Sequence, residues 1–211
     1  MWRTACVILV AALLAYQAGA WLTLDYQVWT AEGARRLQVA RAPVAAPDVA
    51  LRGPGLDAPL PQLLRAEGEV TIVDFFYSRC VTVCLALGNA FQQLQASLLE
   101  QGPGAAPVRL LSISFDPAHD TPDVLAAYAA RLRADPRLWR FAAPADTAGL
   151  RTLLERFEVV VIPDGLGGYE HNAALLVVDR RGRLVGIFDY AEVEAVLAYA
   201  RHLAVMPEGS K

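Results

Sequence analysis

The stretch EVTIVDFFYSRCVTVC, residues 69–84, places two cysteines four positions apart at the end of a strongly apolar run. Residues 69–77 are mostly β-branched or aromatic, which is typical of a strand that is buried on both faces of a sheet. Apolar residues then recur every three or four positions from Cys84 to Leu98, which predicts a helix with one buried face. We therefore expect a strand followed directly by a helix, with Cys80 and Cys84 at the junction.

The chain beyond this unit continues as alternating strand and helix patterns. A second buried strand is expected at 108–116, and Thr121 with Pro122 at the first helical position predicts the start of the next helix. A short strand, a helix, a hairpin and a closing helix are expected at 138–144, 147–157, 172–190 and 191–203. This order predicts an α/β sheet with helices on its faces. In such sheets ligands collect at the carboxyl ends of the strands, where the two cysteines and Asp116 lie.

The composition restricts the classes of protein to consider. The chain has 211 residues, a net charge of −3 and 55% apolar residues, as expected for one medium-sized domain with appendages. Basic residues stand side by side only at Arg35-Arg36 and Arg180-Arg181, so the basic patch that nucleic acid requires is missing. We therefore expect no nucleic-acid partner.

The first 24 residues differ in kind from the rest. Residues 5–24 carry no charged side chain, and a segment of about this length crosses a bilayer as a helix. Arg3 should stay in the cytoplasm, which places the remainder outside it. Residues 18–20 match the pattern that signal peptidase cuts, but the apolar run continues past them, so we favour an uncleaved anchor. The predicted organisation is a transmembrane anchor or signal segment at 1–24, a linker with a short hairpin at 25–68, an ordered domain at 69–205 and a tail at 206–211.

Outside the cytoplasm Cys80 and Cys84 can persist as a disulfide unless a reductant or a metal ion takes them. If both lie on the first turn of the helix, they share one face, and the helix amino terminus and Arg79 favour their thiolate forms. Two thiolates side by side make half of a site for a soft metal ion. The alternatives are a redox-active or a structural disulfide, although a disulfide that closes so short a loop stabilises little. Cys6 is expected to face lipid as a small apolar residue.

A metal site needs further ligands, and the chain has three histidines. A single histidine beside a strand is more often structural than a ligand. His171, however, follows the glycine-rich loop 163–170, which could bring its imidazole toward the cysteines. Two thiolates and one imidazole suit Cu(I), because soft ligands select that ion. His119 and His202 are expected at the surface.

Taken together, these segments resemble the Sco (SenC) family of membrane-anchored, thioredoxin-fold copper proteins. The similarity spans about residues 50–204. Its motifs are Cys80-Val-Thr-Val-Cys84 after IVDFFYSR, then SISFDPAHDTPDVLAAY, then Tyr169-Glu170-His171 followed by LLVVDRRGRLVG. The family commonly has proline after its cysteines, whereas this chain has Val81 and Leu85 there.

The resemblance implies a thioredoxin-like central sheet with flanking helices. It also implies that Cys80, Cys84 and His171 are copper ligands and that the two cysteines form a disulfide when oxidised. Asp116 and Asp120 match the acidic motif near the family's site. From the residues alone they could equally cap the loop and the helix that follows.

Two functions remain open. The first is a metallochaperone that holds a copper ion as Cu(I) and supplies cytochrome c oxidase, which is the family's usual role. The second is a thiol-disulfide reductase, an enzyme in which Cys80 and Cys84 act on client cysteines. The resemblance implies the copper-bearing subunit of the oxidase as a partner, and the cysteine pair implies a thiol-disulfide redox partner. Because no long Arg- and Ser-rich transit segment is present, we expect a single-pass protein of the inner membrane with its C-terminal domain in the periplasm.

Overall fold

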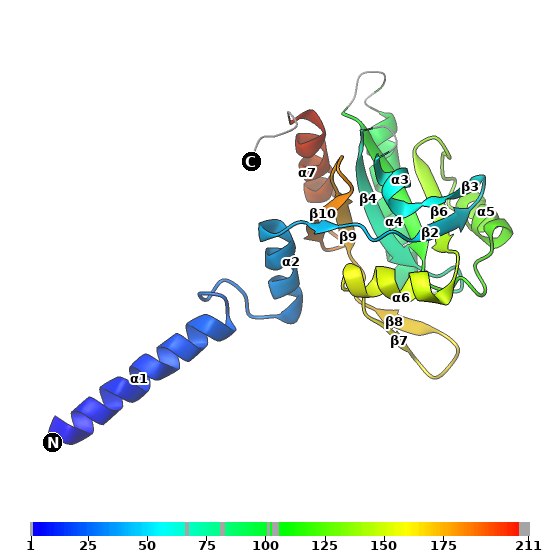
Figure 1. The fold of residues 1–211 in the computed structure, drawn as a ribbon. Helices are drawn as coiled ribbons and strands as arrows, with labels where there is room; N and C mark the ends of the chain where they lie inside the picture. Colours follow the sequence, from blue (N-terminus) through cyan, green and yellow to red (C-terminus); the bar gives the residue numbers. More distant parts are fainter. Residues whose placement is uncertain (1, 66–67, 81–82, 101, 103–105, 207–211) are drawn as a thin grey trace. The chain divides into compact units, whose positions relative to one another are not determined.

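The computed structural model describes residues 2–65, 68–80, 83–100, 102 and 106–206, without the side chains of residues 83–85. The chain divides into two compact units, Met1–Ala42 and Pro43–Lys211, and Figure 1 traces their elements along the sequence. Each unit is described by itself.

The first unit contains the helices α1 (Trp2–Leu22) and α2 (Ala31–Arg41). Helix α1 is long and apolar enough to cross a membrane, and none of its side chains is buried. Beyond its end the chain turns back, and the Tyr26 hydroxyl donates a hydrogen bond to the Tyr16 carbonyl at 2.8 Å. This contact needs Gly19, because a Cβ there would lie 2.8 Å from the Tyr26 hydroxyl oxygen. The expected apolar segment is thus a continuous helix with an aromatic turn at its end.

The second unit is built on a mixed sheet. In the part of the chain that the structure describes, this sheet has eight strands in the order β1-β10-β9-β4-β5-β6-β2-β3. The strands are β1 (Val44–Ala45), β2 (Ala50–Gly53), β3 (Leu56–Pro59), β4 (Val70–Phe76), β5 (Val108–Ser114), β6 (Trp139–Pro144), β9 (Leu175–Val178) and β10 (Arg183–Phe188). Strands β4, β5 and β6 run parallel, and β9 pairs antiparallel with β4 on its other side. Every residue of β4 is buried, as its apolar sequence predicts.

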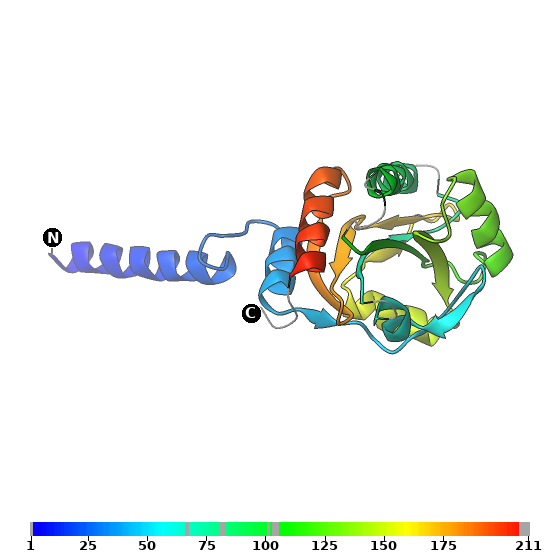
Figure 2. The same ribbon diagram turned by 90° about the horizontal axis from the view of Figure 1, so that it is seen from above.

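Helices cover both faces of this sheet. They are α3 (Leu60–Arg65), α4 (Val83–Leu99), α5 (Pro122–Arg131), α6 (Thr147–Arg156) and α7 (Val193–Val205). Figure 2 shows α4 and α7 over one face of the curled sheet, with α3 and α6 over the other. On the α4 face Phe91 packs on Trp139 with ring centroids 5.3 Å apart, and on the α6 face Phe75 meets Phe157 at 6.3 Å. Successive side chains of each strand point to opposite faces of the sheet, so they contribute to the core on both faces.

The predicted fold class is confirmed, with a thioredoxin-like α/β sheet and helices on its faces. Helix α5 begins as its sequence indicates, because the Thr121 hydroxyl accepts a hydrogen bond from Val124 N–H at 3.4 Å and Pro122 follows the cap. Within the segment 25–68, residues 50–59 form the β2–β3 hairpin, and β2 also pairs with β6.

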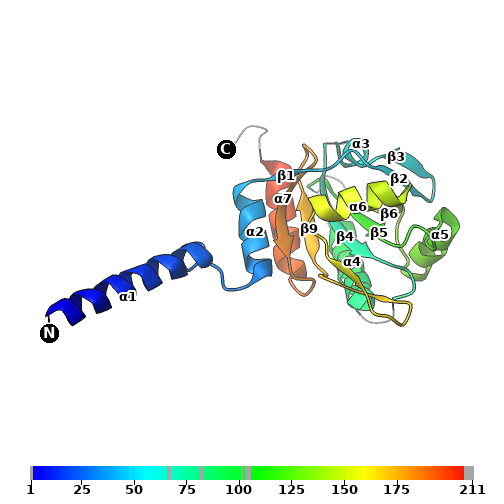
Figure 3. The ribbon, with the colours of Figure 1, turned by 60° about the horizontal axis from the view of Figure 1, so that its bottom comes forward.

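The segment around residues 161–171 differs from the loop that the sequence indicated. It forms a hairpin of two short strands, β7 (Val161–Pro163) and β8 (Tyr169–His171). This hairpin is separate from the main sheet and projects beyond one end of it (Figures 1 and 3). Asp164 closes the turn, since its carboxylate accepts hydrogen bonds from the Leu166 and Gly168 N–H groups at 2.7 and 2.9 Å. These bonds lower the pKa of Asp164.

Candidate metal centre

Cys80 lies in the connection between β4 and α4. Its N–H donates to the Tyr77 carbonyl at 3.2 Å, which makes a tight turn directly after the strand. The side chain is buried, with 4% of its surface exposed. Cys80 lies before helix α4, whose described residues begin at Val83, and Cys84 lies within that helix. Cys80 therefore does not meet the condition that both cysteines lie on the first turn of the helix; the side chain of Cys84 lies outside the described residues.

Asp120 ties the connection of Cys80 to the segment after β5. Its carboxylate accepts hydrogen bonds from the Ser78 N–H at 3.0 Å, from the Ser78 hydroxyl and from the Ser114 hydroxyl. Only 2% of the Asp120 side chain is exposed. A buried carboxylate that receives three donors makes a firm polar anchor. Through Ser78, this anchor fixes the backbone two residues before Cys80.

Asp116 supplies a second link to the same connection. Its carboxylate pairs with the Arg79 guanidinium at 2.7 Å, and this pairing raises the pKa of Arg79. From the sequence, we expect the positive charge of Arg79 to favour the thiolate forms of the cysteines. In the structure, the carboxylate of Asp116 already balances this charge. The residue that caps α5 with its side chain is Thr121. Both acidic side chains instead hold the segment that leads to Cys80.

His171 is the last residue of β8 and lies opposite Val161 in the hairpin. Its half-buried ring contacts Phe115 with centroids 5.1 Å apart. Burial lowers the pKa of His171 to about 4. The imidazole is therefore neutral at neutral pH, which is the form that binds a metal ion.

An aromatic cluster lies between the two segments that carry the candidate ligands. Tyr77 contacts Phe115 at 5.3 Å and Tyr169 at 5.2 Å, measured between ring centroids. Phe115 in turn contacts Tyr169 at 5.7 Å and the ring of His171. Because Tyr77 immediately precedes the turn of Cys80, both segments pack on the same group of rings.

The structure thus brings the segments of Cys80 and His171 to one cluster at the carboxyl end of β4. Among the side chains that it describes, no group of three His, Cys, Asp or Glu residues is close enough to hold a metal ion. Cys84, the third predicted ligand, is not among those side chains. His119 and His202 are exposed, as expected. Cys6 is exposed on α1.

Sequence reasoning missed the residues that organise this region, chiefly Ser78, Ser114, Tyr77 and Phe115. A signal for two of them was present, since Tyr77 and Ser78 stand three and two positions before Cys80. Their partners, however, come from distant parts of the chain.

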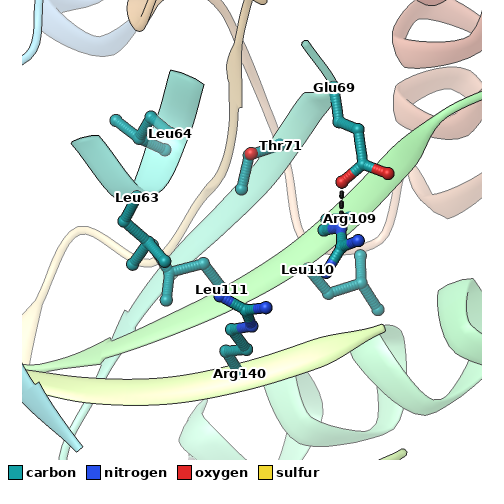
Figure 4. A pocket seen from close by; sticks show the side chains of 8 residues that line it. All are labelled: Leu63, Leu64, Glu69, Thr71, Arg109, Leu110, Leu111 and Arg140. Atoms are coloured by element: carbon teal, nitrogen blue, oxygen red, sulfur yellow. Dashed lines mark hydrogen bonds and ion pairs between the residues drawn. The ribbon is translucent and has the colours of Figure 1, made fainter. Parts of the chain in front are cut away.

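A small pocket lies at the other end of the central strands and takes no part in this region. It lies beside the Glu69–Arg109 ion pair and Thr71, with Leu64 and Arg140 also in its wall (Figure 4). Its volume of about 30 Å³ leaves room for one or two water molecules. The candidate centre is therefore at the carboxyl ends of the strands, as the fold class predicts.

The chain combines a thioredoxin-like sheet with a cysteine after the central strand and a histidine on an adjoining hairpin. This combination defines a class of proteins that carry a thiol and an imidazole at the carboxyl end of the sheet. The sequence model of one family, SCO1/SenC, matches residues 64–204. The chain belongs to the SCO1/SenC family.

Individual relatives agree with this assignment. The SCO1 protein homolog of Bacillus subtilis (strain 168) is 28% identical over 130 residues, which cover 61% of this chain and 65% of the relative. BsSco, described as a Sco family member with a disulfide switch, has a TM-score of 0.67 at 19% identity, covering 79% of this chain and 96% of its own. ScoI of Bradyrhizobium japonicum, solved with copper bound, has a TM-score of 0.60 at 24% identity, covering 75% and 99%. The two structural matches establish the fold.

Proposed function

We propose that this chain is a membrane-anchored metallochaperone that binds Cu(I) through Cys80, Cys84 and His171. The observation that carries the proposal is that the segment of the buried Cys80 and the neutral imidazole of His171 meet at one aromatic cluster at the carboxyl end of β4. The family assignment supports it, and the related ScoI of Bradyrhizobium japonicum was solved with copper bound.

The donor set fits Cu(I) chemically. Thiolate sulfur and imidazole nitrogen are ligands that select this soft ion over the hard cations. Two thiolates and one Cu(I) leave a net charge of −1, and the neutral imidazole adds none. Binding releases the two thiol protons, so the affinity should rise with pH until both cysteines are ionised. The ion can then leave by stepwise exchange of these ligands for those of a client.

The client that we propose is the copper-bearing subunit of cytochrome c oxidase. BsSco is described as a member of a family of cytochrome c oxidase assembly proteins, and this chain belongs to the same family. Helix α1 would anchor the chain in the inner membrane, with the second unit on the periplasmic side. A membrane anchor keeps a chaperone near a membrane-bound client and so raises its effective concentration.

The test is a Cu(I) titration of the reduced full-length chain in detergent against a competing chelator. We expect one Cu(I) per chain and a loss of more than about 10-fold in affinity for His171→Ala, because even the outer partners of metal ligands contribute 10–100-fold. The matched control is His202→Ala, which removes an exposed histidine from α7. Equal affinities of the parent and His171→Ala would refute the proposed ligand set.

A second candidate function is thiol-disulfide reduction, which the disulfide switch of the relative BsSco favours. One cysteine thiolate would attack a client disulfide and release a client thiolate, and the other cysteine would then resolve the mixed disulfide. The products are a client dithiol and a Cys80–Cys84 disulfide, so two electrons pass to the client. This function predicts full turnover of a disulfide substrate by His171→Ala, whereas the metallochaperone has no such requirement.

A further inference from the structure

We propose that Tyr77 is a positioning residue that fixes the segments of Cys80 and His171 relative to each other. The inference rests on the proposed function, since it concerns the site that those two residues would form. Tyr77 is the last residue before the turn and stands three positions before Cys80. Tyr77 makes one hydrogen bond with the segment of each candidate ligand. Its backbone carbonyl bonds the segment of Cys80, and its side-chain hydroxyl bonds the segment of His171.

The first bond is made by the backbone. The Tyr77 carbonyl accepts a hydrogen bond from the Cys80 N–H at 3.2 Å. It sets the direction in which the chain leaves β4 and therefore where Cys80 lies. Because backbone groups make this hydrogen bond, it does not depend on the side chain at position 77.

The second bond is made by the side chain. The Tyr77 hydroxyl accepts a hydrogen bond from the Tyr169 N–H at 3.1 Å and lies 3.5 Å from the Tyr169 carbonyl oxygen. Tyr169 is the first residue of β8, and His171 lies two positions further along the same strand. Residues two apart in a strand point to the same side, so this bond fixes the backbone that aims the imidazole.

Gly168 in the hairpin leaves room for the Tyr77 hydroxyl. A Cβ at Gly168 would lie 3.0 Å from the Tyr77 hydroxyl oxygen and 2.5 Å from a carboxylate oxygen of Asp164. Any other residue at position 168 would therefore press on the hydrogen bond.

The other end of the hairpin is held separately. The Asn172 amide accepts a hydrogen bond from the Val160 N–H at 2.8 Å and donates one to the Glu158 carbonyl at 3.0 Å. His171 thus lies between an anchor on the chain after α6 and the Tyr77 hydroxyl on the chain of Cys80. Of these two anchors, the Tyr77 hydroxyl is the one that joins the segments of the two candidate ligands, and we assign to it the role of setting their separation.

Loss of the hydroxyl should leave the fold intact and loosen the site. Tyr77→Phe keeps the ring contacts with Phe115 and Tyr169 but removes the bond to β8. The hairpin would then sample more positions, and copper binding would bear the entropy of ordering it. Tyr199→Phe is the matched control, because the Tyr199 hydroxyl is likewise bonded to the backbone: it donates to the Val185 carbonyl at 3.3 Å, on the remote α7–β10 contact.

The first measurement is amide hydrogen exchange of the metal-free full-length chain in detergent. We expect the Tyr169 amide to exchange about tenfold faster in Tyr77→Phe, and to stay at the parent rate in Tyr199→Phe. An unchanged Tyr169 rate in Tyr77→Phe would overturn the proposal, whatever the metal does.

The second measurement is a double-mutant cycle on Cu(I) affinity, with Tyr77→Phe and His171→Ala alone and together. We expect Tyr77→Phe to weaken binding about fivefold, the factor that corresponds to one ordinary hydrogen bond, and to have no further effect once His171 is removed. Gly168→Ala, which presses on the hydroxyl without deleting it, should weaken binding in the same way. An equal loss from Tyr77→Phe with and without His171 would overturn the positioning role. If His171→Ala alone has no effect, the proposed function fails first, and the cycle separates the two results.

Discussion

Two buried aspartates of the second unit, one in a loop at the end of the strands and one inside a strand, lie in opposite polar environments. Asp120, at the carboxyl end of the strands, receives hydrogen bonds from both polar groups of Ser78 and from Ser114. Asp74, in the middle of β4, is 3% exposed and is bonded by Ser112, which itself accepts a hydrogen bond from the Trp139 indole at 2.9 Å. Within the described part of the chain, the Oδ1 atom of Asp74 has no hydrogen-bond partner.

This difference separates two roles of a buried acid. Asp120 uses its charge to bind two segments together, and those segments lead to Cys80. Asp74 gains little from its charge, because burial raises its pKa to about 7 while the bond from Ser112 opposes that rise. At the carboxyl end of the strands a carboxylate organises the candidate site, whereas in the sheet interior it costs stability when ionised.

The largest expected effect concerns Asp74. Its carboxyl holds a proton up to about pH 7 in the folded chain, against an ordinary pKa of 3.8. Folding therefore takes up a proton between these values, so the free energy of unfolding falls as the pH rises from 3.8 to about 7. Asp74→Asn cannot ionise, and the parent should lose up to roughly 4 kcal/mol relative to it between about pH 4 and pH 8. Chemical denaturation across this pH range measures the difference.

The control for this prediction is Asp123→Asn, at an exposed position in the first turn of α5. It should follow the pH dependence of the parent. If Asp74→Asn also follows the parent, Asp74 is ionised throughout and the contrast with Asp120 disappears.

The next effect in size is expected at Asp120. Asp120→Ala leaves the Ser78 N–H and two hydroxyl groups without their acceptor in a buried place, so we expect a loss of about 3 kcal/mol in the free energy of unfolding. Asp123→Ala, at the exposed position two residues into the next helix, should cost much less. The comparison fails if both variants unfold at the same denaturant concentration.

The smallest effect is expected at Asp116. Its partner Arg79 is 46% exposed and can be hydrated when the carboxylate is removed, so Asp116→Ala should cost less than about 1 kcal/mol. The released guanidinium should instead favour the thiolate form of Cys80 and so speed its alkylation at neutral pH. The rate of alkylation at Cys80 in a Cys6→Ser, Cys84→Ser background measures this effect. Equal alkylation rates with Asp116 present and with Asp116→Ala would show that Arg79 does not act on the thiol.

Much of the fold could be predicted because local patterns specify it. The buried run of β4 and the regular spacing of Leu87, Phe91 and Leu94 identify a strand and a helix without any distant partner. Thr121 and Pro122 mark the start of α5 in the same way. The assignment of Cys80, Cys84 and His171 as ligands rests on residue type and resemblance, and it stays a prediction.

The arrangement of the candidate site could not be predicted, because it depends on contacts between distant residues. The bond from Tyr169 to Tyr77 spans 92 positions, and the pair of Arg79 and Asp116 spans 37. The β7–β8 hairpin has strands of three residues, the first of which ends in a proline, and glycines between them, which gives no clear alternation. Whether Cys80 lies inside or before the helix depends on where the first turn closes, and the apolar spacing does not determine this.

The way in which the β7–β8 hairpin is held has a consequence for protein engineering. The hairpin is held at its base by Asn172 and beside its turn by Tyr77, while Leu166 in the turn is 93% exposed. Side chains at exposed loop tips are positions where change is well tolerated. A fluorophore attached to the side chain at position 166 would therefore move with the strand of His171 and leave the backbone hydrogen bonds of the turn in place. Such a label would report movements of the hairpin that carries His171.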